Sequence, residues 1–322
     1  MSHLFKDKEK DRVFLTGASG MVGRAVHARL LASERYELLT PSSGELDLRD
    51  QGATHRYLVR NRPRFVVHMA GHIGGIHANI SRPVEFLYEN LIMAMNVIHS
   101  SAEVGVERLI FLGSSCIYPR NCPQPMKESM LLSGPLEPTN EGYSIAKIAG
   151  IRLCQYLNIE RKCDYISLLP CNLYGPYDKF DTQDSHVIPA LMSRIHDAKV
   201  HDISEVEIWG SGASRREFLH VNDMADAISF FLKVSLEPSA PRVFNVGSGL
   251  DISIRDLALL IGEVVGYEGT YRFNEKKPDG MPRKCMDVGR TSRLGWEART
   301  TLREGLERTY TWFLKQKENR HQ

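Results

Sequence analysis

Long hydrophobic runs and a strong excess of one charge are both missing from this sequence. Nowhere do eighteen apolar residues stand together, so the sequence predicts no membrane-spanning helix. The 41 basic and 39 acidic side chains leave a net charge of +2, which excludes a protein that binds nucleic acid or an acidic membrane through its overall field. Any anionic ligand must therefore be held by a local group of basic side chains.

Metal-site and redox spacings are also missing. The six cysteines form no C-x-x-C pair and no cysteine–histidine pattern typical of zinc sites. A chain of 322 residues can bury enough apolar surface without disulfides. We therefore expect free thiols and no bound metal. Segment 1–12 is charged and has no apolar stretch like that of a signal peptide, which predicts a cytoplasmic protein.

The first half of the chain does contain a regular alternation of two patterns. Short apolar runs rich in β-formers predict strands at Arg12–Thr16, Tyr36–Thr40, Phe65–Met69, Arg108–Gly113 and Tyr165–Pro170. Apolar residues at three- and four-residue spacing predict helices between them, at Val22–Ala32, Pro83–Val104 and Thr139–Ile159. This alternation is typical of an α/β fold with a doubly wound parallel sheet, the Rossmann arrangement.

The pattern loosens after Pro176. It predicts helices at His186–Ala198, Val221–Lys233, Ile254–Val265 and Leu302–Lys315, and strands at Val206–Trp209 and Val243–Val246. We expect two interleaved domains. Residues 1–177 with about 217–250 form the Rossmann domain, and residues 178–216 with 251–322 form a smaller α/β domain over the edge of the sheet.

A glycine-rich turn follows the first predicted strand and opens the first predicted helix. It reads Gly17-Ala18-Ser19-Gly20-Met21-Val22-Gly23. Glycines at this spacing let the backbone turn tightly and approach a pyrophosphate, whose charge is stabilised by the free amides of the helix N-terminus. A glycine turn can also simply join a strand to a helix, but its place at the first strand–helix junction favours a dinucleotide-binding site.

The residues after the second predicted strand do not reveal which dinucleotide binds. Segment 40–45 has neither an obvious ribose-binding acid nor an arginine for a 2′-phosphate. Ser42 and Ser43 are compatible with either cofactor. Asp47 and Leu48 are placed to line the adenine pocket, although an aspartate at such a position also commonly serves only as a loop or cap residue.

A serine and a tyrosine–lysine pair supply groups for acid–base chemistry. Ser114 follows the strand predicted at 108–113, and Tyr143 and Lys147 stand four residues apart on a later helix, so both can reach one ligand. A nearby ammonium favours the tyrosinate and eases proton transfer to or from a substrate oxygen, which a serine hydroxyl can hold. A Tyr-x-x-x-Lys spacing alone occurs on many helices. Combined with the glycine turn and the serine, it predicts a nicotinamide-dependent oxidoreductase.

These residues resemble those of the extended short-chain dehydrogenase/reductases and, more narrowly, of the GDP-L-fucose synthase family among them. The resemblance covers nearly the whole chain and is carried by blocks at Gly113–Pro119, Leu136–Glu141, Tyr143–Gly150, Asn172–Pro176, Ser185–Ala190, Trp209–Gly212, Arg216–Val221 and Pro278–Gly280. It implies a GDP-linked 4-keto-6-deoxy sugar as substrate. The implied reaction is epimerisation at carbons 3 and 5, followed by reduction of the carbon-4 ketone by NADPH.

The resemblance also implies catalytic roles. Ser114, Tyr143 and Lys147 correspond to the reductase residues, and Cys116 and His186 to the base and acid of the epimerisation. A ketone at carbon 4 acidifies the hydrogens on both neighbouring carbons, so a thiolate and an imidazolium across the ring could invert each centre through an enolate. Taken alone, Cys116 would more often be a small buried residue, and His186 could simply assist a helix cap.

Binding residues follow from the same resemblance. Cofactor contacts are expected from the glycine turn and from Ser43, Asp47, Leu48, Leu112, Gly113, Ser114, Lys147, Pro170, Asn172, Leu173 and His186. Contacts to GDP or its diphosphate are expected from Arg194, Trp209, Arg216, Asp279 and Lys284, because arginine and lysine suit a diphosphate. Trp209 could instead be a core residue of the smaller domain, and Arg216 a surface ion pair. The Rossmann domain is thus expected to bind NADP(H), and the smaller domain the nucleotide sugar.

The chain departs from the family pattern near both ligands. Ser19 and Ser43 stand where relatives often have a basic group for the 2′-phosphate, so NADP(H) is expected from the resemblance while NAD(H) stays open. His72 stands in place of a lysine near the expected active site. This leaves open a GDP-keto-heptose or a dideoxy sugar as substrate, reduced at carbon 4 with partial or no epimerisation. A non-catalytic protein that keeps the fold to sense a cofactor is a further alternative.

The two long predicted helices bear on assembly. Helices at 83–104 and 139–159 could pair with their symmetry mates as a four-helix interface, which predicts a homodimer. Alternatively, their apolar faces only cover the sheet.

Overall fold

A six-stranded parallel sheet forms the centre of the larger unit in this computed structural model, which describes residues 10–180, 185–277 and 280–320. Its order is β2-β1-β3-β4-β5-β9. The strands are β1 (Asp11–Thr16), β2 (Tyr36–Leu39), β3 (Phe65–His68), β4 (Arg108–Leu112), β5 (Asp164–Pro170) and β9 (Val243–Val246). The chain order reverses between β1 and β3, so the carboxyl ends of these two strands flank the crevice where such sheets bind ligands. The expected doubly wound parallel sheet is confirmed.

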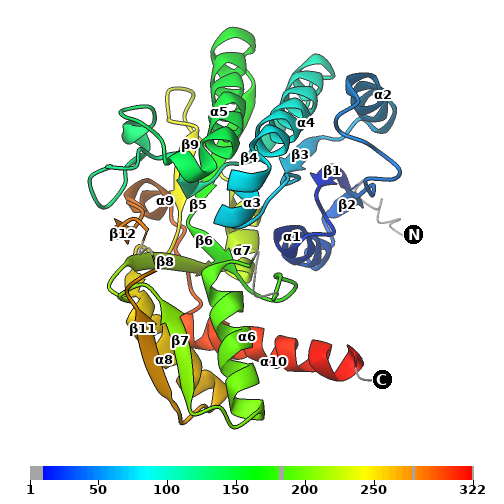
Figure 1. Ribbon diagram of the computed structural model, residues 1–322. Helices are drawn as coiled ribbons and strands as arrows, with labels where there is room; N and C mark the ends of the chain where they lie inside the picture. The colour runs from blue at the N-terminus through cyan, green and yellow to red at the C-terminus, as the bar shows by residue number, and fades with distance from the viewer. Residues whose placement is uncertain (1–9, 181–184, 278–279, 321–322) are drawn as a thin grey trace.

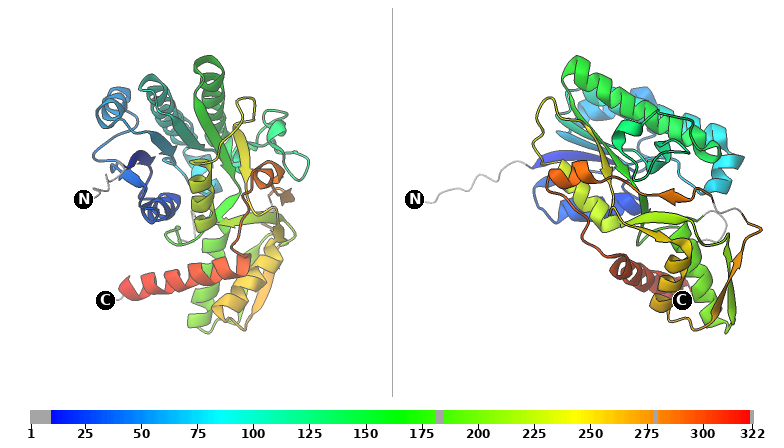
Figure 2. Two further views of the ribbon diagram at one scale, coloured as in Figure 1. Left: turned by 180° about the vertical axis from the view of Figure 1, so that it is seen from behind. Right: turned by 90° about the vertical axis from the view of Figure 1, so that its left-hand side faces the viewer.

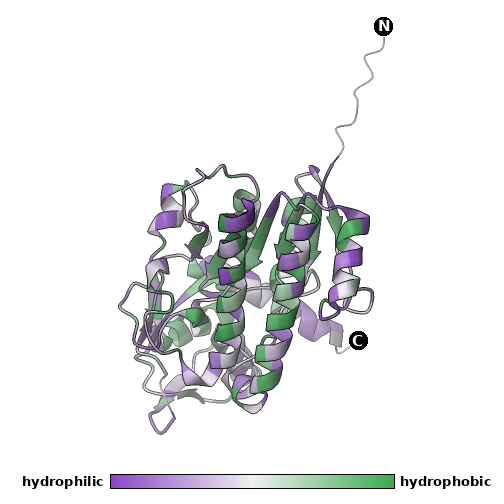
Figure 3. Cartoon of the chain, turned by 90° about the horizontal axis from the view of Figure 1, so that it is seen from above, coloured by the Kyte–Doolittle hydropathy of each residue, from purple (hydrophilic) through white to green (hydrophobic). Residues whose placement is uncertain are grey.

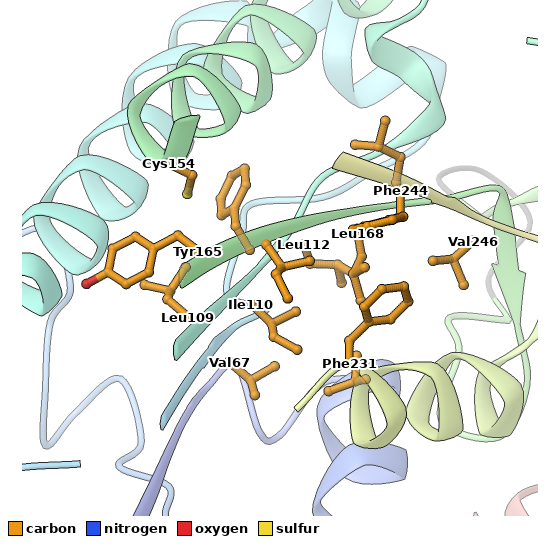
Figure 4. Close-up of a cluster of buried hydrophobic side chains, with 14 of the residues drawn as sticks. Val67, Leu109, Ile110, Leu112, Cys154, Tyr165, Leu168, Phe231, Phe244 and Val246 are labelled. Carbon is orange, nitrogen blue, oxygen red and sulfur yellow. The ribbon is translucent and has the colours of Figure 1, made fainter. Parts of the chain in front are cut away.

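Helices cover both faces of this sheet. Figure 1 shows α2 (Gln51–Asn61), α4 (Pro83–Glu103) and α5 (Glu141–Arg161) above it, and α1 (Met21–Leu31) and α7 (Val221–Phe231) below it. Strands buried on both faces need side chains that pack at successive positions, and every residue of β3 is buried. In Figure 4, Cys154 and Tyr165 lie on the α5 side of the sheet and Phe231 on the α7 side, so the core has two layers.

The smaller unit has its own sheets and its own core. β6 (Asn172–Tyr174), β8 (Arg215–His220), β10 (Asp251–Ser253) and β12 (Arg283–Lys284) form one sheet, and β7 (Glu205–Trp209) pairs with β11 (Thr270–Asn274) in another. The helices of this unit are α6 (Val187–Val200), α8 (Ile254–Val265) and α10 (Leu302–Arg320), visible from two further sides in Figure 2. Its buried apolar residues, among them Met192, Ile195, Leu257 and Ile261, form a cluster separate from the core of the large sheet.

The two units exchange segments. Met286 and Trp296, which the sequence places in the smaller domain, are buried in the core of the large sheet near α9 (Gly289–Arg293). The buried carboxylate of Glu217 helps to hold this crossing, since it accepts hydrogen bonds from the amides of Gly249 at 2.8 Å and Met286 at 2.6 Å. The domain boundaries themselves stay a prediction.

Several elements lie where the sequence predicts none. α2 buries only Thr54 and Leu58 and therefore has little apolar periodicity; it begins where the Asp50 carboxylate accepts a hydrogen bond from the Ala53 amide at 2.8 Å. The other missed elements are short: α3 (Ile76–Ser81), α9, β6, β8, β10, β11 and β12. The helix expected from Thr139 begins at Glu141, because a 3₁₀ turn, η3 (Pro138–Asn140), occupies the preceding residues.

Three features can be stated for the described residues alone. None of their helices has both the length and the apolarity needed to cross a membrane. They contain no group of three or more His, Cys, Asp or Glu side chains that could hold a metal ion. All six cysteines are unpaired.

Candidate active site

The glycine turn is held against the end of β3 by contacts that only glycine permits. Gly17 has a φ of +72°, and a Cβ there would lie 2.8 Å from the amide nitrogen of Ala70. A Cβ on Gly23 would lie 2.0 Å from the carbonyl oxygen of Gly17. Gly20 precedes α1 without a side-chain cap, and no acidic residue occupies the first turn. The first amides of α1 are therefore available to an anion such as a pyrophosphate.

The crevice between β1 and β3 is braced by a buried pair. The Thr16 hydroxyl lies 2.7 Å from Nδ1 of His68 and accepts hydrogen bonds from the amides of Met69 and Ala70, both at 3.1 Å. Burial, and then the charge of Lys147, lower the pKa of His68 to about 3, so this histidine is neutral. His68 thus supports the turn rather than exchanging protons, and no motif in the sequence pointed to it.

The residues expected around the adenosine end of the cofactor differ in their exposure and contacts. Ser43 is exposed, and Leu48 packs against the core of the large sheet. Asp47 forms an ion pair with Arg49 at 2.8 Å, and the hydrogen bonds from Arg49 lower the pKa of this carboxyl. Asp47 therefore has a structural partner of its own, in line with the loop role left open by the sequence.

The residues expected around the nicotinamide end come from β4 and β5. Leu112 ends β4, and its carbonyl oxygen accepts a hydrogen bond from Nζ of Lys147 at 2.9 Å. Gly113 follows, where a Cβ would lie 2.5 Å from Cδ2 of Leu169. Pro170 ends β5, and Asn172 and Leu173 lie in β6. The side-chain amide of Asn172 donates to the carbonyl oxygen of Glu217 at 2.8 Å. These residues converge on the carboxyl edge of the large sheet.

Ser114, Tyr143 and Lys147 are brought together at that edge. Lys147 is 5% exposed, and its ammonium lies 5.7 Å from the centre of the Tyr143 ring. Burial lowers the pKa of Lys147 to about 8. Burial also raises the pKa of Tyr143 well above its usual value, and nearby Cys116 raises it further, whereas a hydrogen bond with Ser114 opposes the rise. Tyr143 is therefore a protonated phenol at neutral pH, suited to donate a proton to a substrate oxygen.

Cys116 lies beside this trio, in the 3₁₀ turn η1 (Ser115–Ile117). Its amide donates to the Ser114 hydroxyl at 3.2 Å, and its carbonyl oxygen accepts a hydrogen bond from the Ser144 hydroxyl of α5 at 2.9 Å. The thiol is partly exposed, so Cys116 is not simply a buried core residue. Nζ of Lys284, from β12, donates to its sulfur at 3.7 Å. Lys284, expected at the diphosphate, therefore contacts the candidate base directly.

His186 stands at the start of α6, in the other unit. It is exposed and makes no side-chain hydrogen bond to the helix N-terminus, so the cap role left open by the sequence is not observed. Within the described residues, His186 makes no hydrogen bond or ion pair with the catalytic candidates at the end of β4, which are Ser114, Cys116, Tyr143 and Lys147. His186 thus comes from a different element than the group at the end of β4.

Asp178 interacts with His186 and was not singled out from the sequence. One of its oxygens accepts the Lys179 amide at 2.8 Å, and the other is buried without a partner among the described residues. Burial raises the pKa of Asp178, and the charge of His186 opposes the rise. The signal in the sequence is weak, since an aspartate after a Gly-Pro turn is common in loops.

The residues expected at the nucleotide sugar cluster on the smaller unit. Trp209 is 57% exposed, which excludes the core role considered from the sequence. The Arg194 guanidinium lies 5.7 Å from its ring, and Nζ of Lys277 lies 5.1 Å from it. Lys277 was missed because a lone lysine in a polar segment carries no pattern.

Arg216 and Lys284 lie together in a different sheet. They are paired neighbours in β8 and β12, and Arg216 also donates to the carbonyl oxygen of Arg215 at 2.8 Å. Asp279 lies outside the described residues. The smaller unit therefore brings Lys284, with Arg216 beside it, to Cys116, and these two cations suit an anionic diphosphate.

Comparison with known proteins identifies what the chain is similar to. The model of the NAD dependent epimerase/dehydratase family matches residues 13–247. The chain is 48% identical to GDP-L-fucose synthase 1 of Arabidopsis thaliana, over 96% of this chain and 95% of that protein. It is 47% identical to the GDP-L-fucose synthase of Escherichia coli K12, over 95% and 97% of the two chains.

Solved structures give the same fold. A GDP-mannoheptose C4 reductase from Campylobacter jejuni with NADP bound superposes with a TM-score of 0.86 at 31% identity, covering 95% of this chain and 99% of that one.

Proposed function

The chain belongs to the NAD dependent epimerase/dehydratase family, and we propose that it converts a GDP-4-keto-6-deoxy-mannose-type sugar to GDP-L-fucose or a close analogue. The reaction comprises epimerisation at carbons 3 and 5 and reduction at carbon 4. The observation that carries the proposal is the group at the end of β4, where Tyr143, Lys147 and Ser114 meet Cys116. Near-complete coverage of two GDP-L-fucose synthases supports it.

The residues present fit NADP(H) as cofactor. The glycine turn has no Cβ to block a pyrophosphate, and the first amides of α1 have no competing side-chain cap. The NADP bound in the similar C4 reductase supports the same cofactor. When bound, NADPH supplies the hydride that reduces carbon 4. Lys147, fixed by Leu112, lies where it can hold the ribose at the reacting end.

Tyr143 and Ser114 act on the carbonyl oxygen at carbon 4. The hydroxyl of Ser114 holds this oxygen, and the protonated Tyr143 donates a proton to it as carbon 4 is reduced. The ammonium of Lys147 nearby stabilises the tyrosinate that remains. The buried, preformed arrangement lets each group act without first being ordered.

Cys116 and His186 serve the epimerisation. The carbon-4 ketone acidifies the hydrogens at carbons 3 and 5, so the Cys116 thiolate removes a proton and His186 returns one to the opposite face. Tyr143 stabilises the enolate oxygen between the two steps. His186 comes from the start of α6, so the proposal requires the sugar to lie between the two units.

Product stereochemistry tests the proposal. The chain is incubated with GDP-4-keto-6-deoxy-D-mannose in D₂O with and without NADPH, and NMR reads deuterium at carbons 3 and 5 and the configuration at carbon 4. We expect exchange at both carbons without NADPH, and GDP-L-fucose when it is added. In Cys116→Ser, exchange should fall by about 10²-fold or more while the fold is kept. Unchanged exchange in Cys116→Ser would remove the assigned base.

A GDP-4-keto-sugar C4 reductase without full epimerase activity is the second candidate. The similarity to the GDP-mannoheptose C4 reductase favours it. His72 also favours it, because this histidine stands in place of a lysine of the family pattern near the expected active site. The His72 ring packs 4.7 Å from the Phe86 ring, with its nitrogens 3.7 Å from Glu85 and 3.6 Å from Glu89. NADPH consumption with a GDP-keto-heptose, without deuterium uptake at carbons 3 and 5, would favour this candidate.

The GDP moiety is assigned to the basic cluster on the smaller unit. Arg194, Arg216 and Lys284, with Asp279, contact the GDP or its diphosphate, and the exposed ring of Trp209 offers a surface for the base. Equilibrium titration with GDP alone tests this part, because it needs no turnover. Unaltered GDP binding in both Arg194→Ala and Arg216→Ala would contradict it.

We also propose a homodimer built on α4 and α5. These helices lie side by side, and Figure 3 shows apolar residues interspersed with polar ones along both of them. Val84, Tyr88, Tyr156 and Ile159 are each more than half exposed. Sedimentation is expected to give twice the chain mass, and Tyr88→Glu is expected to shift it toward the monomer. A wild-type monomer at assay concentration would remove the idea. Cytoplasmic location stays a prediction.

A further inference from the structure

The positions expected to bind a 2′-phosphate hold no cation in this chain. Ser19 stands in the glycine turn, and Ser42 and Ser43 follow β2. The amide and hydroxyl of Ser42 are already occupied, since both donate to the Glu45 carboxylate at 2.8 Å. The end of β2 therefore presents a carboxylate, which repels a phosphate dianion.

Arg24 brings a guanidinium to the same place from another element. It lies in the first turns of α1, and its Nε donates to the carbonyl oxygen of Ser19 at 2.8 Å. This contact puts the cation at the residue where the glycine turn lacks one. Within the described part of the chain, the two terminal nitrogens of Arg24 have no hydrogen-bond or ion-pair partner, so their donors are available to a ligand.

Tyr177 fixes the direction of this guanidinium. The Arg24 guanidinium stacks 4.6 Å from the centre of the Tyr177 ring, whose centre lies 5.0 Å from that of Trp312 in α10. Tyr177 has a φ of +70°, an uncommon backbone conformation for a tyrosine, so this position is held against local strain. An arginine held by a carbonyl oxygen and a ring loses less freedom when it binds an anion.

A cavity of about 530 Å³ connects Arg24 with both parts of the expected adenosine site. Among the described residues that line it are Ser19 of the turn and Thr40 at the end of β2. Its lining includes two basic side chains, Arg24 and His27, and no acidic one among the described residues. In Rossmann folds, the ribose 2′-position lies between the glycine turn and the end of the second strand. The Arg24 guanidinium thus lies in the lining at that position.

We propose that Arg24 binds the 2′-phosphate of NADPH and selects NADPH over NADH, in place of the basic residue missing at Ser19 and Ser43. The inference rests on the proposed dinucleotide-binding function of the glycine turn. Arg24 determines cofactor preference and takes no part in the reaction at carbon 4. Bidentate donation from its terminal nitrogens suits phosphate oxygens.

Binding of adenosine fragments tests this without turnover. Calorimetry with adenosine 2′,5′-bisphosphate and with 5′-AMP measures the 2′-phosphate preference, which is expected to be at least about tenfold in the wild type. In Arg24→Ala and Arg24→Gln the preference should fall to about twofold or less, with 5′-AMP binding nearly unchanged. Arg24→Lys keeps the charge and should retain part of it. Arg24→Gln keeps a long polar side chain, so a loss of preference in this variant reflects the missing charge rather than a shortened side chain.

The matched control is Arg29→Ala, on the same helix. Arg29 pairs with Asp226 at 2.6 Å, away from the cavity lining, and its removal should leave both affinities within about twofold. Circular dichroism confirms the fold of each variant. A preference kept in both Arg24→Ala and Arg24→Gln, or an equal loss of both ligands, would overturn the inference.

Failure of the inference and failure of the proposed function give different results. A wild type that binds NADPH and NADH equally well overturns only the role of Arg24. A wild type that binds neither dinucleotide overturns the dinucleotide site itself, and this inference with it.

Discussion

The two sides of the candidate active site are built in different ways. On the large sheet, Lys147 is buried and fixed by a backbone carbonyl, and Cys116 is tied to both Ser114 and α5. On the smaller unit, Trp209 is largely exposed, with Arg194 and Lys277 near its ring. The side that carries the proton donor is therefore anchored around a buried lysine, and the side that binds the nucleotide is open. Substitutions on the first side should change rate, and those on the second should change affinity.

The largest expected effect comes from the phenol. Tyr143→Phe should lower kcat for reduction of the 4-keto sugar by about 10²- to 10⁴-fold, because it removes the proton donor. Stability should change little, since the ring is kept. The measurement is the loss of NADPH absorbance at saturating substrate. Tyr156→Phe, an exposed tyrosine of the same helix, is the control. Reduction at the wild-type rate by Tyr143→Phe would refute the assignment of Tyr143 as the proton donor.

The pH dependence of reduction should reveal the buried lysine. Its pKa is lowered to about 8, so Lys147 is charged below that pH and neutral above it. Because the charged form stabilises the tyrosinate, kcat should fall about tenfold between pH 7 and pH 9. A lysine with the usual pKa of about 10.4 would remain charged throughout this interval. A profile that stays flat to pH 10 would contradict a functional charge on Lys147.

Lys284 tests whether the two sides are coupled. It belongs to the smaller unit but donates to the sulfur of Cys116. Lys284→Gln should slow deuterium exchange at carbons 3 and 5 about tenfold, through loss of a charged hydrogen bond, and should slow reduction less. Lys276→Gln, which changes an exposed lysine of the same unit, is the matched control. An equal effect on the two rates would show that Lys284 serves only binding.

The smallest effect is expected at Trp209. Trp209→Ala should raise KM for the GDP-sugar by a few-fold to about tenfold, with kcat and the melting temperature nearly unchanged, because the side chain is exposed. Trp209→Phe keeps an aromatic surface and should be milder. A loss of more than a few degrees in melting temperature would contradict a binding role for an exposed Trp209 and would show that its side chain stabilises the fold.

Much of the large unit could be predicted because its signals are local. The strands of the sheet and helices α1, α4 and α5 were expected within a few residues, since apolar spacing is strong where both faces of a sheet are buried. α2 and the strands β8, β10 and β12 were missed, because their residues are mostly polar or they are only two or three residues long. Their existence depends on pairing with distant segments, as the register between Lys284 and Arg216 illustrates.

The sequence by itself determined the glycine turn, the Tyr143–Lys147 pair and the doubly wound sheet, because the first two depend on local spacing and the third on the alternation of strands and helices along the chain. Only the tertiary structure decided that Lys284 meets Cys116, 168 positions earlier in the chain, and that Arg24 packs against the ring of Tyr177. Packing of remote segments sets these contacts, and burial sets the lowered pKa of Lys147. Neither packing nor burial can be read from spacing along the chain.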